Sequence, residues 1–286
     1  MTRIETPDGC NLHVEETGTG TPILFLHEFA GDHRSWEHQV RHFSRSHRCI
    51  TFAARGYPPS DVPELPERYG QEIAVADAIA VLDALGVEGA HIVGHSMGAY
   101  TALHVGLRHP SRCLSVAALG CGWGSAPGDR ETAAQACDDV AALFRDSPIA
   151  EAAAAYARFP MRQTFEAKDP RGFAEFERLL AEHSAEGSAH TMLQLQKLRP
   201  TLRDMEDDLR TFAPPLLVLV GDEDHPCIDG SVFLKRTVPT AALAIVPRAG
   251  HTITTEEPAV VNAELSTLFA DAALGTWMSH RAVPAP

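Results

Sequence analysis

Short apolar runs alternate along the chain with segments in which apolar residues recur at helical spacing. Continuous apolar runs predict buried strands over residues 23–26, 49–53, 90–93, 113–119, 215–220 and 241–246. An alternating pattern over 11–16 predicts an antiparallel edge strand, and helical spacing predicts helices over 71–85, 97–107 and 258–269. Strands that alternate with helices are typical of a mostly parallel, doubly wound sheet, so the sequence predicts an α/β fold.

The strand pattern stops between residues 121 and 211. Alanine-rich helices are predicted there over 131–145, 149–158, 172–181 and 190–198, separated by Pro148, Pro160, Pro170 and Pro200. We take the run at 113–119 as the sixth strand, and expect the helices after it to form a cap over the carboxyl edge of the sheet. Helices that merely extend the core are the alternative. The expected organisation is a core of residues 1–120 and 212–276, a cap of residues 121–211, and a loose tail of residues 277–286.

The chain has 286 residues, with 24 basic and 38 acidic side chains and a formal net charge of −14. Proteins bind nucleic acids and anionic membranes through clustered Lys and Arg, and this chain is acidic. We therefore expect neither as a partner. The N-terminus lacks a secretory apolar segment, and no run approaches the roughly 18 residues of a membrane span, so a cytoplasmic location is expected. The six scattered cysteines show no metal-ligand spacing and are expected to be reduced, several of them in the core.

The strongest chemical signal is the segment Gly94-His95-Ser96-Met97-Gly98, which follows a predicted strand and opens a predicted helix. A serine in this setting occupies a strained strand-to-helix turn. The glycines two residues away on either side let the backbone pass neighbouring chains without a Cβ clash. The helix N-terminus also favours developing negative charge. We therefore predict that Ser96 is a nucleophile rather than an ordinary loop serine.

A serine hydroxyl needs a base to remove its proton, and the chain holds 15 histidines. His251 follows the last predicted strand and precedes the closing helix, where a loop can reach over the sheet. Asp224 follows the strand at 215–220 and is predicted to orient His251, with Asp222 as the competing candidate. His95 is expected to point away from the attacking oxygen. Other histidines fit surface, helix or cap positions: His33, His38, His42, His47, His104, His183 and His190.

A tetrahedral intermediate of acyl transfer needs two backbone N–H donors aimed at its oxyanion. The N–H of Met97, directly after the nucleophile, supplies one of them. The second is expected from the loop at 27–31, which follows the strand at 23–26, and the N–H of Phe29 is the most plausible donor.

Together these segments resemble the α/β-hydrolase superfamily with a helical cap, over essentially the whole chain apart from the cap sequence and the tail. The family pattern is a strand and His-Gly-x-x-x-Gly-like loop, then Asp-x-Arg-Gly-x-Gly-x-Ser, the serine turn, Gly-x-x-Asp and Gly-His. It is matched here by residues 27–31, 53–60, 94–98, 221–224 and 250–251. The resemblance implies a triad of Ser96, Asp224 and His251, and an oxyanion hole formed by Phe29 and Met97.

Two departures from this pattern stand out. The segment 53–60, Ala-Ala-Arg-Gly-Tyr-Pro-Pro-Ser, lacks the family's aspartate and second glycine; it lies away from the chemistry and is interpreted as structural. Glu28 occupies the usual glycine of the His-Gly loop. It could face the pocket and bind a cationic or hydroxylated substrate group, or act as a second acid. Alternatively it turns outward to pair with an arginine such as Arg34, which is slightly favoured because a carboxylate beside an oxyanion hole opposes the developing charge.

We expect an esterase that cleaves a small to medium, apolar carboxylic ester through an acyl-enzyme on Ser96, without a metal or an organic cofactor. The same triad could instead cleave a thioester, lactone, amide or carbon–carbon bond, and a cofactor-free oxygenase or a non-hydrolytic receptor is the alternative of a different class. Trp123 is the best single candidate for a pocket wall, and no cap arginine is assigned to a substrate carboxylate. A small-molecule substrate is expected, and monomer and homodimer both stay open.

Overall fold

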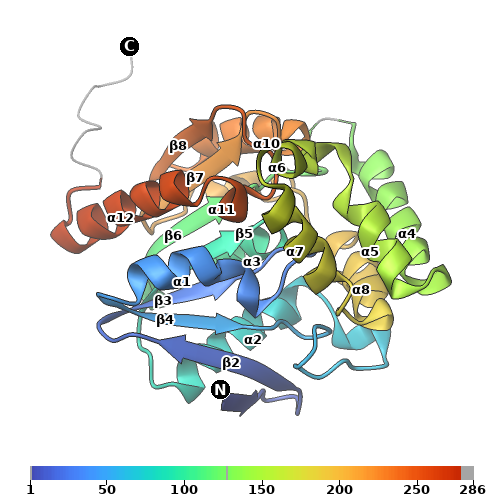
Figure 1. Ribbon diagram of the computed structural model, residues 1–286. Coiled ribbons are helices and arrows are strands. Elements are labelled where there is room, and N and C mark those ends of the chain that lie inside the picture. Colours follow the sequence, from blue (N-terminus) through green and yellow to red (C-terminus); the bar gives the residue numbers. More distant parts are fainter. Residues whose placement is uncertain (1, 127, 278–286) are drawn as a thin grey trace.

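The computed structural model describes residues 2–126 and 128–277, which form an eight-stranded sheet with helices on both faces (Figure 1). The strand order is β1-β2-β4-β3-β5-β6-β7-β8. Strands β1 and β2 are antiparallel to their neighbours, and all other pairs are parallel. The strands are β1 (Thr2–Glu5), β2 (Asn11–Thr17), β3 (Thr21–Leu26), β4 (His47–Phe52), β5 (Ala90–His95), β6 (Cys113–Leu119), β7 (Leu216–Gly221) and β8 (Ala241–Val246).

Alternate residues of the central strands pack into two separate apolar clusters, one on each face of the sheet. Leu24 of β3 packs in the cluster that also contains residues of α2, α3 and α10, whereas Ile23 and Phe25 pack with residues of α1 and α12. This two-faced burial explains why the strand sequences are continuously apolar. The covering helices are α1 (Glu37–Phe43), α2 (Gln71–Ala84), α3 (Met97–Arg108), α10 (His225–Thr237), α11 (Ile253–Glu256) and α12 (Pro258–Leu274).

The predicted α/β fold with a mostly parallel sheet is confirmed, but one edge of the sheet differs from the prediction. The segment at 11–16 is antiparallel as expected, yet β2 pairs with β4 on one side and with β1 on the other. The edge strand is therefore β1, which has four residues with only Ile4 buried. Its sequence carries too short an alternation to be predicted as a strand.

A helical insertion after the sixth strand is also confirmed (Figure 1). Its helices gather beyond the carboxyl ends of the parallel strands, the side to which the arrow of β4 points. They are α4 (Arg130–Asp146), α5 (Ile149–Ala157), α6 (Gln163–Lys168), α7 (Pro170–Leu180), α8 (Ala185–His190) and α9 (Glu206–Leu209). Single turns complete the described elements: η1 (His33–Trp36), η2 (Pro66–Arg68), η3 (Pro110–Arg112), η4 (Pro160–Arg162) and the π-helical η5 (Thr191–Gln196).

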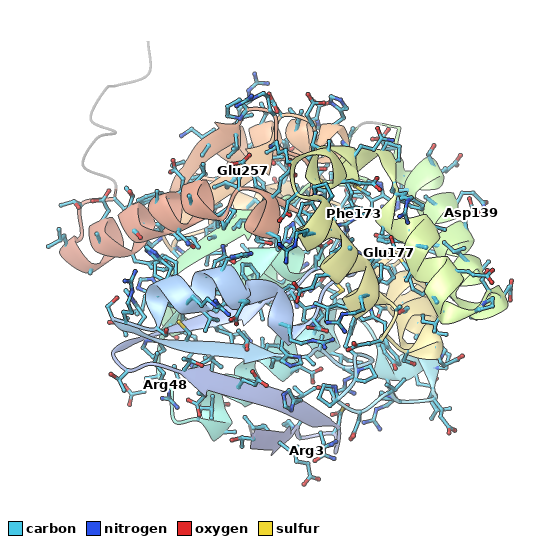
Figure 2. All side chains as sticks on the ribbon, in the orientation of Figure 1. Arg3, Arg48, Asp139, Phe173, Glu177 and Glu257 are labelled. Atoms are coloured by element: carbon cyan, nitrogen blue, oxygen red, sulfur yellow. The ribbon has the colours of Figure 1, made fainter. Side chains whose placement is uncertain are left out.

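The cap has an apolar cluster of its own, which also takes in Phe29 and Met97 from the core. Within the cap, helix α7 packs on α5. Arg158, at the end of α5, pairs with Glu177 at 2.6 Å and lies over the ring of Phe173 at 5.6 Å. Figure 2 shows Phe173 and Glu177 on α7. The cap is thus a packed layer that shares its core with the segments predicted to form the oxyanion hole.

Three other sequence predictions meet the structure as follows. Trp277, predicted to begin a loose tail, donates its indole N–H to the carbonyl oxygen of Thr240 at 2.8 Å, and residues 278–286 of that tail lie outside the described residues. All six cysteines are unpaired and five are buried, so the prediction that several lie in the core is confirmed. Among residues 2–126 and 128–277, no helix combines the length and apolar character that a membrane span requires.

The backbones of cap and core lie in close contact at Gly187 of α8. A Cβ at this position would lie 2.0 Å from the carbonyl oxygen of Gly56, which is backbone and has little room to move. We predict that Gly187→Ala lowers the free energy of unfolding by about 1–3 kcal/mol through overpacking, although alanine is the better helix former. Urea denaturation measures this change.

The matched control for this substitution is Gly89→Ala. A Cβ at Gly89 would meet its nearest neighbour, Leu114 Cδ2, at an ordinary 3.6 Å. This variant should stay within about 0.5 kcal/mol of the wild type. Equal stability of the two variants would contradict a tight contact between cap and core at Gly187.

Candidate active site

Ser96 occupies the turn between β5 and α3, in a backbone conformation that side-chain-bearing residues rarely adopt. Its φ is 53° and its ψ is −109°. Its backbone N–H donates to Leu119 O at 2.7 Å, and its carbonyl oxygen accepts from the N–H of Ala99 at 3.0 Å. Such a conformation costs about 1–3 kcal/mol and persists only where the surroundings enforce it. The strained turn predicted from the sequence is therefore present.

The two flanking glycines are required by backbone contact. A Cβ at Gly94 would lie 2.1 Å from the carbonyl oxygen of Gly98, and a Cβ at Gly98 would lie 2.1 Å from that of Leu26. Any side chain at either position would push β3, β5 and α3 apart. The serine turn is consequently packed directly against the end of the strand that leads into the candidate oxyanion loop.

His251 and Asp224 lie side by side in the loops after β8 and β7. The Nδ1–H of His251 donates to Asp224 Oδ2 at 2.8 Å, and both side chains are buried. Asp222, the competing candidate, instead accepts the backbone N–H of Ala249 at 3.2 Å, which supports the loop that carries the histidine. The geometry therefore favours Asp224 as the partner of His251.

Two further contacts hold His251 in place. Its backbone N–H donates to the carbonyl oxygen of Met161 in the cap at 2.8 Å, and its own carbonyl accepts the Nε2–H of His95 at 2.7 Å. Burial lowers the pKa of His95 to about 4, so this ring is neutral at pH 7. The side chain of His95 thus supports the His251 loop, a role that sequence reasoning did not identify.

The loop after β3 is fixed by His27, the first residue of the His-Gly-like segment. Its Nε2 accepts the backbone N–H of Ala54 at 2.9 Å, so Nδ1 carries the proton and donates to the carbonyl oxygen of Glu28 at 2.7 Å. Burial lowers the pKa of His27, in keeping with this neutral tautomer. Within the described part of the chain, the N–H groups of Phe29 and Met97 have no hydrogen-bond acceptor.

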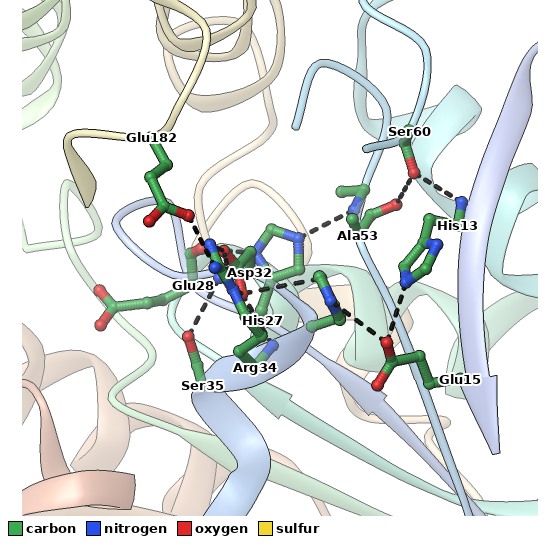
Figure 3. Close-up of polar contacts among 12 residues, drawn as sticks. His13, Glu15, His27, Glu28, Asp32, Arg34, Ser35, Ala53, Ser60 and Glu182 are labelled. Atoms are coloured by element: carbon green, nitrogen blue, oxygen red, sulfur yellow. Dashed lines mark hydrogen bonds and ion pairs between the residues drawn. The ribbon is translucent and has the colours of Figure 1, made fainter. Parts of the chain in front are cut away.

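Glu28 does not turn outward to pair with Arg34, and this favoured alternative is wrong. Arg34 contacts Asp32 and Glu182, and the Glu28 carboxylate points away from it (Figure 3). Glu28 is buried and forms a two-pronged ion pair with Arg162 of the cap, whose Nη1 donates to Oε1 at 3.1 Å and whose Nη2 donates to Oε2.

The Glu28–Arg162 pair lies deep between core and cap, beside His251. Arg162 has no exposed surface, and its Nη1 also donates to Thr252 Oγ1 at 2.6 Å. Burial is the largest single effect and raises the pKa of Glu28, but the charge of Arg162, its hydrogen bond and the neighbouring His95 and His251 together lower this pKa to about 2. The distance from Glu28 Oε2 to His251 Nε2 is 3.9 Å, too long for a hydrogen bond. A buried carboxylate beside the candidate oxyanion loop is thus neutralised by a cap cation.

Several histidines assigned to the surface or the cap are more enclosed than the sequence suggests. His33, predicted to be exposed, is buried and lies 3.6 Å from Glu15 Oε1. His104 of α3 and His183 and His190 of the cap are buried as well. These histidines are absent from the lining of the cavity that contains His251.

Ser96 and His251 line a single cavity of about 180 Å³ between the sheet and the cap. Trp123 lies on its wall, and Glu28 is not among its lining residues. The remaining lining is largely apolar and comes mostly from cap helices: Ala136, Val140, Tyr156, Phe159, Met161, Met192, Gln196 and Cys227. The arrangement places a serine hydroxyl and a carboxylate-oriented imidazole in the same enclosed, apolar space.

Comparison with known proteins agrees with this architecture. The family model of the alpha/beta hydrolase fold matches residues 21–258. The AB hydrolase superfamily protein YisY of Bacillus subtilis is 30% identical over 268 residues, which covers 91% of this chain and 95% of that protein. The putative carbamate hydrolase RutD of Azorhizobium caulinodans is 29% identical and covers 88% and 92% of the two chains.

Solved structures show the same fold. The enol-lactonase from Burkholderia xenovorans LB400 superimposes with a TM-score of 0.82 at 19% identity, covering 94% of this chain and 100% of that chain. A thermophilic esterase from Thermogutta terrifontis gives 0.80 at 24% identity, covering 95% and 98%. The family match over residues 21–258 and the near full-length similarity to YisY show that this chain belongs to the α/β-hydrolase fold family.

Proposed function

We propose that this α/β-hydrolase cleaves carboxylic esters through a covalent acyl-enzyme on Ser96. The observation that carries the proposal is the shared cavity of Ser96 and His251, with the Nδ1–H of His251 hydrogen-bonded to buried Asp224. Donation from Nδ1 leaves Nε2 with a free lone pair, which is the form of imidazole that can accept the serine proton.

In the proposed reaction, Ser96 Oγ attacks the ester carbonyl while His251 Nε2 accepts its proton. The charge that develops on the carbonyl oxygen is stabilised by the N–H groups of Phe29 and Met97. His251 then returns the proton to the leaving alcohol, and the C–O bond to that alcohol breaks. A water molecule, deprotonated by the same nitrogen, then attacks the acyl carbon. The bond from that carbon to Ser96 Oγ breaks, His251 returns the proton to Ser96 Oγ, and the acid is released.

The Glu28–Arg162 pair supports this chemistry in two ways. The Glu28 carboxylate lies 3.9 Å from His251 Nε2, beside the candidate oxyanion loop. Arg162 cancels the negative charge that would otherwise oppose the oxyanion. The pair also ties the oxyanion loop to the cap, which keeps water away from the reacting groups.

Substrate size follows from the cavity. A volume of about 180 Å³ with a mostly apolar lining accommodates a short acyl or alcohol group rather than a long chain. The cap residues Val140, Phe159 and Met192 supply no charged group on this wall. A small to medium ester is therefore the proposed substrate.

Removal of the nucleophile tests the proposal. We predict that Ser96→Ala lowers kcat for a p-nitrophenyl ester at least about a thousandfold, because no other group can form the acyl-enzyme. The partly buried Ser266 of α12, which donates to Asn262 O, offers the control: Ser266→Ala should keep wild-type kcat. Turnover that survives in Ser96→Ala would count against nucleophilic catalysis.

Loss of the buried carboxylate should destabilise the protein in a pH-dependent way. Glu28→Gln leaves Arg162 buried without a charged partner, which we predict costs about 3–5 kcal/mol at pH 7 by urea denaturation. The folded-state pKa of Glu28 is lowered from 4.5 to about 2. Its stabilisation is complete above pH 4.5 and is lost as the pH falls toward 2, so wild type and variant should converge in that window.

The double variant Glu28→Gln/Arg162→Met separates the pair from its surroundings. Removal of both charges should recover much of the stability lost in the single variant, because no unpaired charge stays buried. An equal loss in the single and double variants at pH 7, or a difference that does not narrow below pH 4.5, would contradict the ion-pair account.

A further inference from the structure

Arg199 is a buried cation without an acidic partner. Its residue is only 8% exposed, and its guanidinium lies 3.6 Å from the centre of the Tyr100 ring. In the described part of the chain the side chain donates only to the amide oxygen of Gln196, and no carboxylate lies within 4.0 Å. Four of its five N–H groups are thus available.

A buried charge is normally paired, because the loss of hydration is costly. Arg162, which is likewise buried in the cap, follows this rule in its ion pair with Glu28. The more exposed neighbours of Arg199 are also paired: Lys197 contacts Asp138 at 2.6 Å, and Arg130 contacts Asp204 at 2.9 Å. Arg199 departs from it, and stacking on an aromatic ring offsets only part of the cost. The missing partner has the chemistry of an anion with oxygen acceptors in one plane.

Arg199 lines a cavity of about 30 Å³ that adjoins the one containing Ser96. Both cavities have Trp123 and Gln196 in their walls, so these two side chains stand between them. Tyr100, under the guanidinium, is one helical turn after Ser96, since its N–H donates to Ser96 O at 3.2 Å. The smaller cavity is the size of a carboxylate group rather than of a ring, and the larger one is apolar.

We propose that Arg199 binds a carboxylate carried by the substrate, at the end remote from the reacting ester. The substrate class is then a monoester of a short dicarboxylic acid, or a lactone that carries a free carboxylate. This assignment rests on the proposed function for its ester, but the anion site itself does not. The anion site lies in the cavity next to the one that contains Ser96, on the other side of Trp123 and Gln196.

The kinetic test compares two esters that differ in whether the remote carboxyl group is free or methylated: the mono-4-nitrophenyl ester of glutaric acid and its methyl 4-nitrophenyl diester. The corresponding ester pairs of adipic and suberic acid place the carboxylate farther from the reacting ester. The wild type should favour the anionic ester of one pair. Arg199→Gln should lower kcat/KM for that ester roughly 10- to 100-fold, mainly through KM, and leave the neutral ester within about threefold. Arg199→Lys should retain part of the preference because it keeps the charge.

Arg203→Gln is the matched control. Arg203 lies in the same segment and pairs with no carboxylate among the described residues, but it is exposed, packs over Phe233 and lines neither of the two cavities. Arg203→Gln should leave kcat/KM unchanged for both the anionic and the neutral ester. An equal loss of kcat/KM for both esters in Arg199→Gln would mean that Arg199 has only a structural role, in packing against Tyr100. A wild type without preference for any anionic ester would likewise overturn the proposal.

A binding measurement keeps the two proposals distinguishable. If no ester is turned over, the proposed hydrolysis fails, and the anion site is judged on Ser96→Ala by its thermal shift with 4-nitrophenyl glutarate and with glutarate. A rise in Tm that disappears in Ser96→Ala/Arg199→Gln supports the site. The absence of any rise over the ligand series, or a rise that survives loss of Arg199, overturns it.

Discussion

The candidate site depends on backbone segments that pass each other at distances only glycine allows. Gly98 lies against the carbonyl oxygen of Leu26, and Gly221 lies against that of Ala249, so that a Cβ on either glycine would sit 2.1 Å from an oxygen. These contacts bring the candidate oxyanion loop to the serine turn, and the loop of Asp224 to the loop of His251. Gly250 extends the series into the cap, against Met161 O. Side-chain chemistry is thus positioned by backbone packing.

Charged side chains of the cap act on the site that backbone packing assembles. The cap contributes Arg162, whose charge makes a buried Glu28 tolerable beside the candidate oxyanion hole, and the same pair anchors the cap over His251. Arg199 is a second buried cap cation, and it has no acidic partner in the part of the chain that the structure describes. The cap therefore has one buried cation that is neutralised within the protein and, in the adjoining cavity, one that we propose is neutralised by a ligand.

The sequence predicted the parts of the site that are local. The serine turn, Asp224 and His251 each follow an apolar strand at short, readable spacing, and the parallel sheet brings their carboxyl ends to one edge. The partner of Glu28 could not be predicted, because Arg162 is 134 residues away in the chain. It also belongs to the cap, where prolines separate the helices and no strand pattern is present. The edge strand β1 was not predicted for a different reason: its four residues are too few to show an alternation of apolar and polar side chains.

The central claim, covalent catalysis at Ser96, is tested most directly by intact-mass spectrometry after exposure to a fluorophosphonate. The account predicts one adduct per chain, mapped by proteolysis to the peptide that carries Ser96, and no adduct in Ser96→Ala. A folded wild type that stays unlabelled, or an adduct that persists in Ser96→Ala, would contradict it.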